Sequence, residues 1–443
     1  MDRLRSLRAV EEPCPVADAD SRASHALRLL HTHRGNPSRE IDRLLADDPR
    51  SVPGHCLRAA FIGCADDDGS RRTLADSLAV IEAAGLPEGH CARRHAAAAR
   101  AWLAHDAALA LERWGDIVVD APRDILALVC THALDFRLGR RRMLCDRIAR
   151  VLPAWDASMP GYASVLAMYA FGLEENGHYR RAEDAARRAL ALDHGHPAAI
   201  HALAHVMEMQ GRAREGLAFL SDTESHWIDG NGFSVHLAWH RALFHLEVDD
   251  RAAALATYDE RIAPAHGVSA LADASALLWR LELRDIDVGV RWPSLAQRWE
   301  RRALGGLRPF YAVHAMMAYA AAGHAASAQQ IFALLQGIAA SASPLLPEES
   351  LAGPLCEALL AFIRRDYVAC IDRLHHVRDI ASRCGGSLAQ CDVIHLTFTE
   401  AALRARQARL ARALVAERAA QKPASRFNRR LLARAGMTMP APA

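Results

Sequence analysis

Small and apolar residues recur along the chain in stretches of helical length, separated by short turns that contain Gly, Asp or Pro. Ala, Leu, Arg and Glu dominate, whereas the β-branched and aromatic residues that favour strands are scarce. The clearest stretch runs from Tyr169 through a turn at Asn176-Gly177 to Pro197, with alanines spaced along its second half. Small residues at such spacing let two antiparallel helices approach closely, and the proline ends the second helix. This stretch therefore predicts a pair of helices joined by a tight turn.

The positions of such turns indicate a repeat. The turn at Asn176-Gly177 recurs 34 residues later at Gln210-Gly211, and Ala182 recurs as Gly216 at the same offset. A helix-turn-helix period of this length is typical of tetratricopeptide repeats, although the aromatic consensus positions are poorly kept in this chain. Further turns between helices are expected at Ala104-His105-Asp106, Leu138-Gly139, Asp249-Asp250, Ala322-Gly323-His324, Arg365-Asp366 and Arg406-Gln407.

These elements predict an all-α fold of tetratricopeptide-like helix-turn-helix repeats, about ten to twelve helix pairs stacked into one curved superhelix. We expect this solenoid to be continuous over residues 21–435, because no linker rich in Gly, Ser or Pro divides it. Residues 1–20, which include two prolines, and residues 436–443 are predicted to be loose tails.

Charge and composition narrow the classes of partner. Lys and Arg together number 54 against 52 Asp and Glu, so the net charge of +2 provides no strong basic field for nucleic acid or an anionic membrane. No apolar stretch approaches the roughly 18 residues that span a bilayer, and the N-terminal residues lack the apolar segment of a secretory signal. The ten cysteines form no CxxC pair. We therefore predict a cytoplasmic, reduced protein without nucleic-acid or membrane partners.

The 23 histidines include two pairs with helical i, i+4 spacing. His201 and His205 share one helix face with Glu208, and His236 and His240 follow 35 residues later. By the repeat register both segments are first helices of adjacent repeats, which line the concave surface of a tetratricopeptide stack. We expect the four imidazoles, together with Glu208 and Glu247, to face one hollow.

Three interpretations of this cluster remain open. An i, i+4 pair can chelate zinc, so the metal ligands, if there are any, would be the four histidines, although the HExxH form is absent. Alternatively, the imidazoles and Glu208 provide acid/base or anion-recognition chemistry, because histidine titrates near neutral pH. The third interpretation is a structural polar network between helices. The candidate catalytic or ligand-contact residues are His201, His205, Glu208, His236 and His240.

Other predicted first helices carry polar residues that would line the same hollow. Arg280 and Arg291 lie next to tryptophans, where they either clamp a carboxylate or phosphate or form an Arg–Trp stack or salt bridge between repeats. Gly385-Gly386-Ser387 forms either an anion-binding turn or a plain helix N-cap. No Walker loop, GxSxG motif or dinucleotide fingerprint is present. The predicted ligand-binding residues are Glu175, Asp273, Arg280, His314, Gln390 and Asp392.

Several motifs, in fixed order from about residue 25 to 435, resemble the tetratricopeptide repeat protein 38 family. This resemblance implies a helical-repeat fold rather than a defined activity, because the biochemical role of the family is poorly defined. The motifs are Ala170 to Glu175, His201 to Met209, His236 and His240 around Trp239, Asp273 to Leu281, Val288 to Trp292, Gly385-Gly386-Ser387 and Asn428 to Leu432.

The chain departs from the family pattern at several polar positions. Leu237 and Ala312 stand where the family commonly has polar residues, and the sequence from Leu388 to Cys391 lacks an arginine that usually follows the Gly-Gly-Ser motif. If the family shares a catalytic centre, these departures imply that this chain has altered or lost part of it.

The two histidine pairs favour a helical repeat protein that binds a small molecule or a peptide terminus in a concave cavity lined by His and Glu, with acid/base catalysis as an option. The sequence does not identify a cofactor, and a divalent metal ion is one candidate. Two alternatives remain: a tetratricopeptide scaffold for protein–protein interaction, and a pseudoenzyme that retains only binding.

Overall fold

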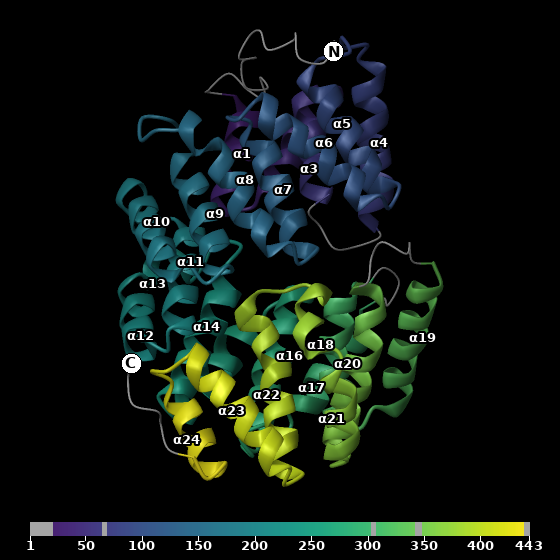
Figure 1. Cartoon of the computed structure of the whole chain (residues 1–443). Helices are drawn as coiled ribbons and strands as arrows, with labels where there is room; N and C mark the ends of the chain where they lie inside the picture. Colours follow the sequence, from purple (N-terminus) through teal and green to yellow (C-terminus); the bar gives the residue numbers. More distant parts are fainter. Residues whose placement is uncertain (1–20, 64–68, 303–306, 342–347, 438–443) are drawn as a thin grey trace, which may run out of the picture. The chain divides into compact units, whose positions relative to one another are not determined.

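The structure, a computed structural model, describes residues 21–63, 69–302, 307–341 and 348–437. Throughout these residues helices follow one another from α1 to α24 without a β-strand, which confirms the predicted all-α fold (Figure 1). The predicted tail at 1–20 and most of the predicted tail at 436–443 lie outside the described residues. In the part of the chain that is described, no helix combines the length and the apolarity needed to cross a membrane.

The chain folds into two compact units. Unit 1 comprises residues 1–136, 140–199 and 230–232, and unit 2 comprises residues 137–139, 200–229 and 233–443. One continuous superhelix over residues 21–435 stays a prediction. The helices of unit 1 are α1 (Arg22–Thr32), α2 (Pro37–Asp47), α3 (Val52–Gly63), α4 (Gly69–Ala83), α5 (Cys91–Leu103), α6 (Ala107–Asp120), α7 (Ile125–Arg137), α8 (Arg141–Val151), the 3₁₀ turn Leu152–Ala154, α9 (Tyr162–Glu174) and α10 (Tyr179–Leu192).

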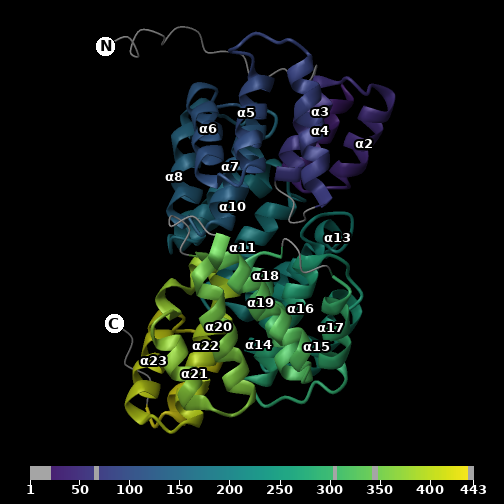
Figure 2. The same cartoon turned by 90° about the vertical axis from the view of Figure 1, so that its right-hand side faces the viewer.

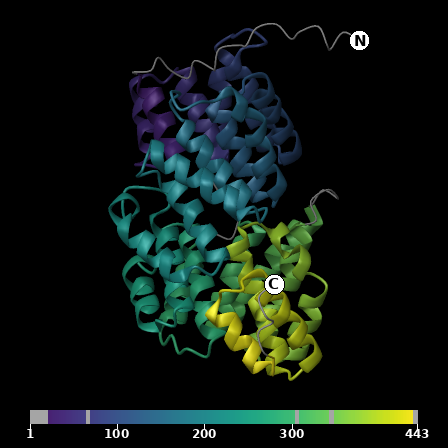
Figure 3. The same ribbon diagram turned by 60° about the vertical axis from the view of Figure 1, so that its left-hand side comes forward.

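Unit 2 continues the same pattern of short helices. In Figure 2, α16, α18 and α20 follow one another side by side, and Figure 3 shows the C-terminal helices in yellow packed together. Its helices are α11 (Pro197–Met209), α12 (Ala213–Asp222), α13 (Glu224–Trp227), α14 (Ser234–Glu247), α15 (Arg251–Thr257), the π-helical turn Tyr258–Ile262, α16 (Val268–Glu282), α17 (Arg291–Glu300), α18 (Pro309–Ala322), α19 (Ala325–Ser341), α20 (Glu348–Ile363), α21 (Tyr367–His375), the 3₁₀ segment Arg378–Cys384, α22 (Leu388–Arg404), α23 (Ala408–Gln421) and α24 (Arg426–Arg434).

The predicted turns lie between helices, and their residue types explain why. Gly177 and Gly211 adopt φ angles of 76° and 73°, a left-handed conformation that glycine reaches without steric cost. The six further predicted turns also fall at junctions between consecutive helices. At three of these junctions an aspartate caps the next helix by accepting a hydrogen bond from a backbone N–H, namely Asp106, Asp250 and Asp366.

Small residues allow close helix packing, as the sequence predicts. Ala182 and its counterpart Gly216 are both buried. A Cβ atom added to Gly216 would lie 2.4 Å from the Phe244 ring, and one added to Gly172 on α9 would lie 2.5 Å from the carbonyl group of Leu144 on α8. At both glycines, a neighbouring side chain or backbone occupies the space that a larger residue would need for its own side chain.

Replacing Gly172 with alanine is therefore expected to destabilise unit 1 by about 1–3 kcal/mol, because backbone atoms cannot move aside as a flexible side chain does. The measurement is urea unfolding followed by circular dichroism. Gly337→Ala on α19 is the matched control, because its added Cβ meets nothing within 4 Å. That helical substitution should be neutral or stabilising by about 0.5–1 kcal/mol. Equal effects of the two substitutions would contradict the close approach of α8 and α9.

Buried tryptophans connect the helices of unit 2. Trp279 on α16 donates a hydrogen bond from Nε1 to Thr397 Oγ1 on α22 at 2.9 Å, and Trp299 on α17 donates to Ser275 Oγ on α16 at 3.0 Å. Both rings are fully buried, so their polar edges are satisfied inside the core. These bonds fix α16 in the middle of unit 2, where it carries Asp273 and Arg280.

Candidate functional site

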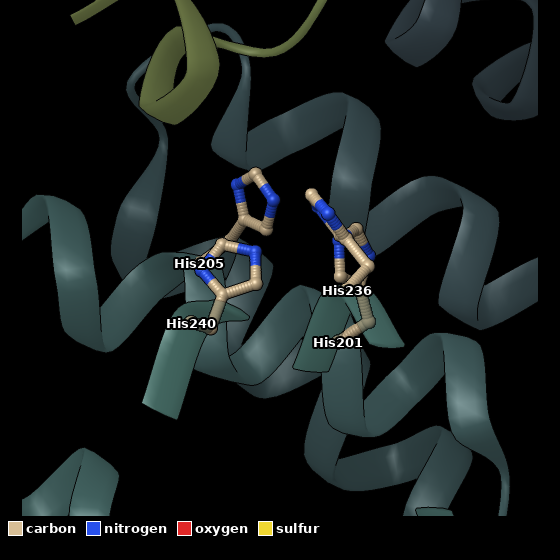
Figure 4. A group of neighbouring side chains, drawn as sticks. All are labelled: His201, His205, His236 and His240. Carbon is tan, nitrogen blue, oxygen red and sulfur yellow. The ribbon is translucent and has the colours of Figure 1, made fainter. Parts of the chain in front are cut away.

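Four histidines of unit 2 converge from two helices, as the close-up in Figure 4 shows. His201 and His205 lie one turn apart on α11, and His236 and His240 lie one turn apart on α14. Ring centroids are separated by 4.4 Å for His201 and His205, 4.5 Å for His205 and His240, and 4.8 Å for His236 and His240. One nitrogen from each ring lies within 4.8 Å of the other three. The two pairs therefore form one group, called the four-histidine cluster below.

Two carboxylates orient this cluster. Glu208 Oε2 accepts a hydrogen bond from His240 Nδ1 at 2.7 Å, and both carboxylate oxygens of Asp273 lie within 3.0 Å of His236 Nδ1. Because an ionised carboxylate only accepts, each Nδ1 must carry the proton, and each Nε2 then has a free lone pair. Asp273 is predicted from the sequence to contact a ligand in the hollow, and in the structure it is the hydrogen-bond partner of His236.

Burial keeps His240 in its neutral form. The His240 side chain is fully buried, and burial, followed by the charges of His205 and His236, holds the pKa of His240 well below its usual value. Its Nε2 has no hydrogen-bond partner among the described residues. The His236 side chain is 19% exposed, so the cluster is accessible to solvent from this side.

Two aromatic rings pack against the cluster. His201 stacks on Phe233 at 4.5 Å, and His236 stacks on Trp239 at 5.1 Å. The guanidinium of Arg280 lies 5.2 Å from the Trp239 ring on the side of α16. An Arg–Trp stack was one of the two interpretations of Arg280, and the observed partner is Trp239 rather than its sequence neighbour Trp279.

A cavity of about 50 Å³ lies beside Glu208 within unit 2. Two of its lining residues, Asp392 and Arg418, form an ion pair with N–O distances of 2.6 and 3.3 Å. Burial alone would raise the pKa of the Asp392 carboxyl group. The nearby cations, Arg418 first among them, lower this pKa by more than burial raises it, so it lies well below its usual value. The charged side chains that line the cavity are Glu208, Glu247, Arg280, Arg284, Asp392, Arg418 and Lys422.

Several predicted contact residues have local partners. Glu175 belongs to unit 1, where its carboxylate lies 3.2 Å from Arg141. His314 Nδ1 donates to the Phe310 carbonyl at 2.8 Å, and burial lowers the pKa of His314 to about 4. Gln390 forms a capping box with Ser387 at the start of α22, which corresponds to the plain N-cap interpretation of the Gly-Gly-Ser segment. Arg291 pairs with Asp259 at 2.5 and 2.8 Å, the salt-bridge interpretation.

The positions that depart from the family pattern are part of the packing. Leu237 and Ala312 are fully buried, and Cys391 donates from Sγ to the Gly385 carbonyl at 3.5 Å near Leu388, the first residue of α22. Their effect on activity stays a prediction. Arg284, Arg418 and Lys422 line the cavity but are not among the site residues predicted from the sequence. The only available signal was that Lys422 is the single lysine in a chain rich in arginine.

No protein-family model matches the chain. Among solved structures, it is similar to a chain in the structure of Naa15/Naa10 bound to HypK-THB, with 12% identity and a TM-score of 0.26, covering 96% of this chain and 69% of that one. It is also similar to the pentatricopeptide repeat protein PPR10 in complex with an 18-nt psaJ RNA element, with 15% identity and a TM-score of 0.29, covering 92% and 72%. The resemblance to the tetratricopeptide repeat protein 38 family stays a prediction.

Proposed function

We propose that unit 2 binds one divalent transition-metal ion, with zinc as the first candidate, through the four-histidine cluster. The observation that carries this proposal is the convergence of four imidazoles, one nitrogen from each within 4.8 Å of the others. Two of the rings are oriented by carboxylates, as histidine ligands of metals usually are. The ion would join α11 and α14, the first helices of adjacent repeats.

The geometry requires only a small adjustment. Tetrahedral zinc holds histidine nitrogens at about 2.0–2.1 Å, which places the nitrogens about 3.3 Å from one another. The rings would therefore approach by roughly 1.5 Å at most, starting from the 4.8 Å limit. We expect rotation about the side-chain torsions of the four residues to provide this movement.

The surrounding charges favour a divalent cation. Glu208 and Asp273 together contribute two negative charges, each hydrogen-bonded to one ring of the cluster. A buried cation without such countercharges would cost several kcal/mol. Imidazole ligands favour Zn, Cu, Ni and Fe, whereas Mg and Ca prefer oxygen ligands.

The exposed edge of His236 determines from which side a further ligand could reach such an ion. Four imidazoles complete a tetrahedral ligand set, so a further ligand has to enter as a fifth ligand or replace one ring. His236 is the member for which this is easiest, because its side chain is 19% exposed while that of His240 is fully buried. A small polar ligand would therefore reach the ion from the His236 side.

A second candidate function is acid/base chemistry by His236 and Asp273 without a metal. The observation that favours it is the hydrogen bond of 2.9 Å between a partly exposed imidazole and a buried carboxylate, which suits a general base. In this case the other three histidines would serve as a polar network. Metal analysis distinguishes the two candidates.

We expect the purified protein to retain about one equivalent of zinc per chain, measured by inductively coupled plasma mass spectrometry. Replacement by cobalt(II) should give the intense visible absorption of four-coordinate cobalt. His314→Ala is the matched control, because His314 is also a buried histidine of unit 2 and bonds within its own helix. This variant should keep the ion and the cobalt spectrum. Folded wild-type protein that takes up neither metal would refute the proposal.

A further inference from the structure

The cavity beside Glu208 is lined by charged residues from five helices of unit 2 and from the residues just after α16 and α23. Four cationic side chains and three carboxylates line it, so its formal charge is +1. The side chains of Arg418 and Lys422 are only 8% and 13% exposed. Charges in such a setting are expensive unless they are paired. The partners of each charged group therefore show whether the cavity has room for a further negative charge.

The carboxylates are already engaged. Asp392 neutralises Arg418 through two contacts, and one oxygen of Glu208 accepts from His240. Glu247 accepts a hydrogen bond from the backbone N–H of Phe427 at 3.2 Å. Glu208 and Glu247 thus supply two negative charges for the three cations that Asp392 does not neutralise.

Those three cations have incomplete partners. Arg280 donates to the carbonyls of Ala276 and Ala389, and Arg284 donates to the carbonyl of Leu246, so both guanidinium groups are bonded to neutral acceptors. Lys422 lies 3.7 Å from the second oxygen of Glu208, which is beyond hydrogen-bond distance. Among the side chains that line the cavity, the cations therefore outnumber the carboxylates by one.

Size and charge together select the ligand. A volume of about 50 Å³ holds a few water molecules or one small polar group. A single excess positive charge matches a monoanion better than a phosphate dianion. Both the guanidinium fork and the ammonium group bind carboxylate oxygens well.

We propose that this cavity binds a small carboxylate group, held by Lys422, Arg280 and Arg284. The carboxylate belongs either to a free small acid or to the end of a larger ligand such as a peptide terminus. The proposal does not depend on the metal, because none of these three side chains belongs to the four-histidine cluster. Glu208 contacts both sites, with one oxygen near Lys422 and the other bonded to His240.

Acetate is the probe for a free acid, titrated calorimetrically into metal-free protein at constant ionic strength with chloride as the reference salt. A short peptide with a free carboxyl terminus and the same peptide as its amide test the second source. We expect Lys422→Met to weaken carboxylate binding at least tenfold and Lys422→Arg to retain most of it. Arg409→Met is the matched control, because Arg409 is an exposed cation on α23, the helix that ends just before Lys422, and this variant should bind like the wild type.

Binding of acetate supports a free acid, and binding of the peptide acid but not of its amide supports a chain terminus. Three outcomes overturn the proposal: wild-type protein that binds neither acetate nor the peptide acid, binding of phosphate alone, or unchanged binding in folded Lys422→Met. Because the titration uses metal-free protein, a failure here is distinct from a failure of the metal site, which metal analysis reports.

Discussion

His240→Ala is expected to lower the affinity for zinc by more than 100-fold. This loss is larger than the roughly 10–100-fold that follows when a residue hydrogen-bonded to a metal ligand is replaced and the ligand itself is kept. The substitution removes a fully buried imidazole whose Nε2 has no other partner among the described residues. It also leaves Glu208 without the hydrogen bond from His240. The affinity is measured by competition with a chromophoric chelator at pH 7.

Glu208→Gln and Asp273→Asn test the orienting carboxylates. Each keeps the size of the side chain and removes its negative charge, so we expect zinc affinity to fall by about 10–100-fold. His314→Ala is again the control and should leave the affinity within about twofold. If His240→Ala and His314→Ala had the same small effect in folded protein, the cluster would be a structural network and not a metal site.

Acidification is expected to destabilise both units between pH 6.5 and 4. Burial lowers the pKa of His196 in unit 1 and of His314 in unit 2 to about 4, from the ordinary value of 6.5. Across this interval the unfolded chain takes up a proton on each residue and the folded chain does not, so stability is complete above pH 6.5 and is lost as the pH falls. At about 1.4 kcal/mol per pH unit, each histidine should account for roughly 3 kcal/mol by pH 4.

Urea unfolding of metal-free protein at a series of pH values measures this loss, since removing the metal prevents its release from contributing. His196→Gln and His314→Gln cannot take up the proton. Each variant should therefore show a slope of stability against pH that is shallower by about 1.4 kcal/mol per pH unit. Slopes identical to that of the parent protein in both variants would contradict the assignment of these histidines as buried and neutral.

Much of the fold could be predicted from the sequence because the signals are local. The turns at Gly177 and Gly211 depend on the preference of glycine for positive φ, and the caps at Asp106 and Asp250 depend on a side chain that bonds a backbone three residues away. The helical period likewise places His201 and His205 on one face, as it does His236 and His240. Each of these statements involves residues within one or two turns of a helix.

The rest of the site depended on contacts between distant residues. Asp273 lies 37 residues from His236, and Lys422 is separated from Glu208 by more than 200 positions, so no periodicity relates them. Gln390 shows the opposite case: its position on a predicted first helix suggested a ligand contact, but its side chain forms a local capping box with Ser387.

The sequence by itself determined the all-α class, the helix-turn-helix period and the pairing of histidines within each helix, because helix geometry and turn chemistry act over a few residues. Only the tertiary structure decided that the two pairs converge, that Glu208 and Asp273 orient them, and that Lys422 faces a cavity with an excess positive charge. Those features arise from the packing of α11, α14, α16 and α23, and burial there sets which charges are paired and which histidines stay neutral.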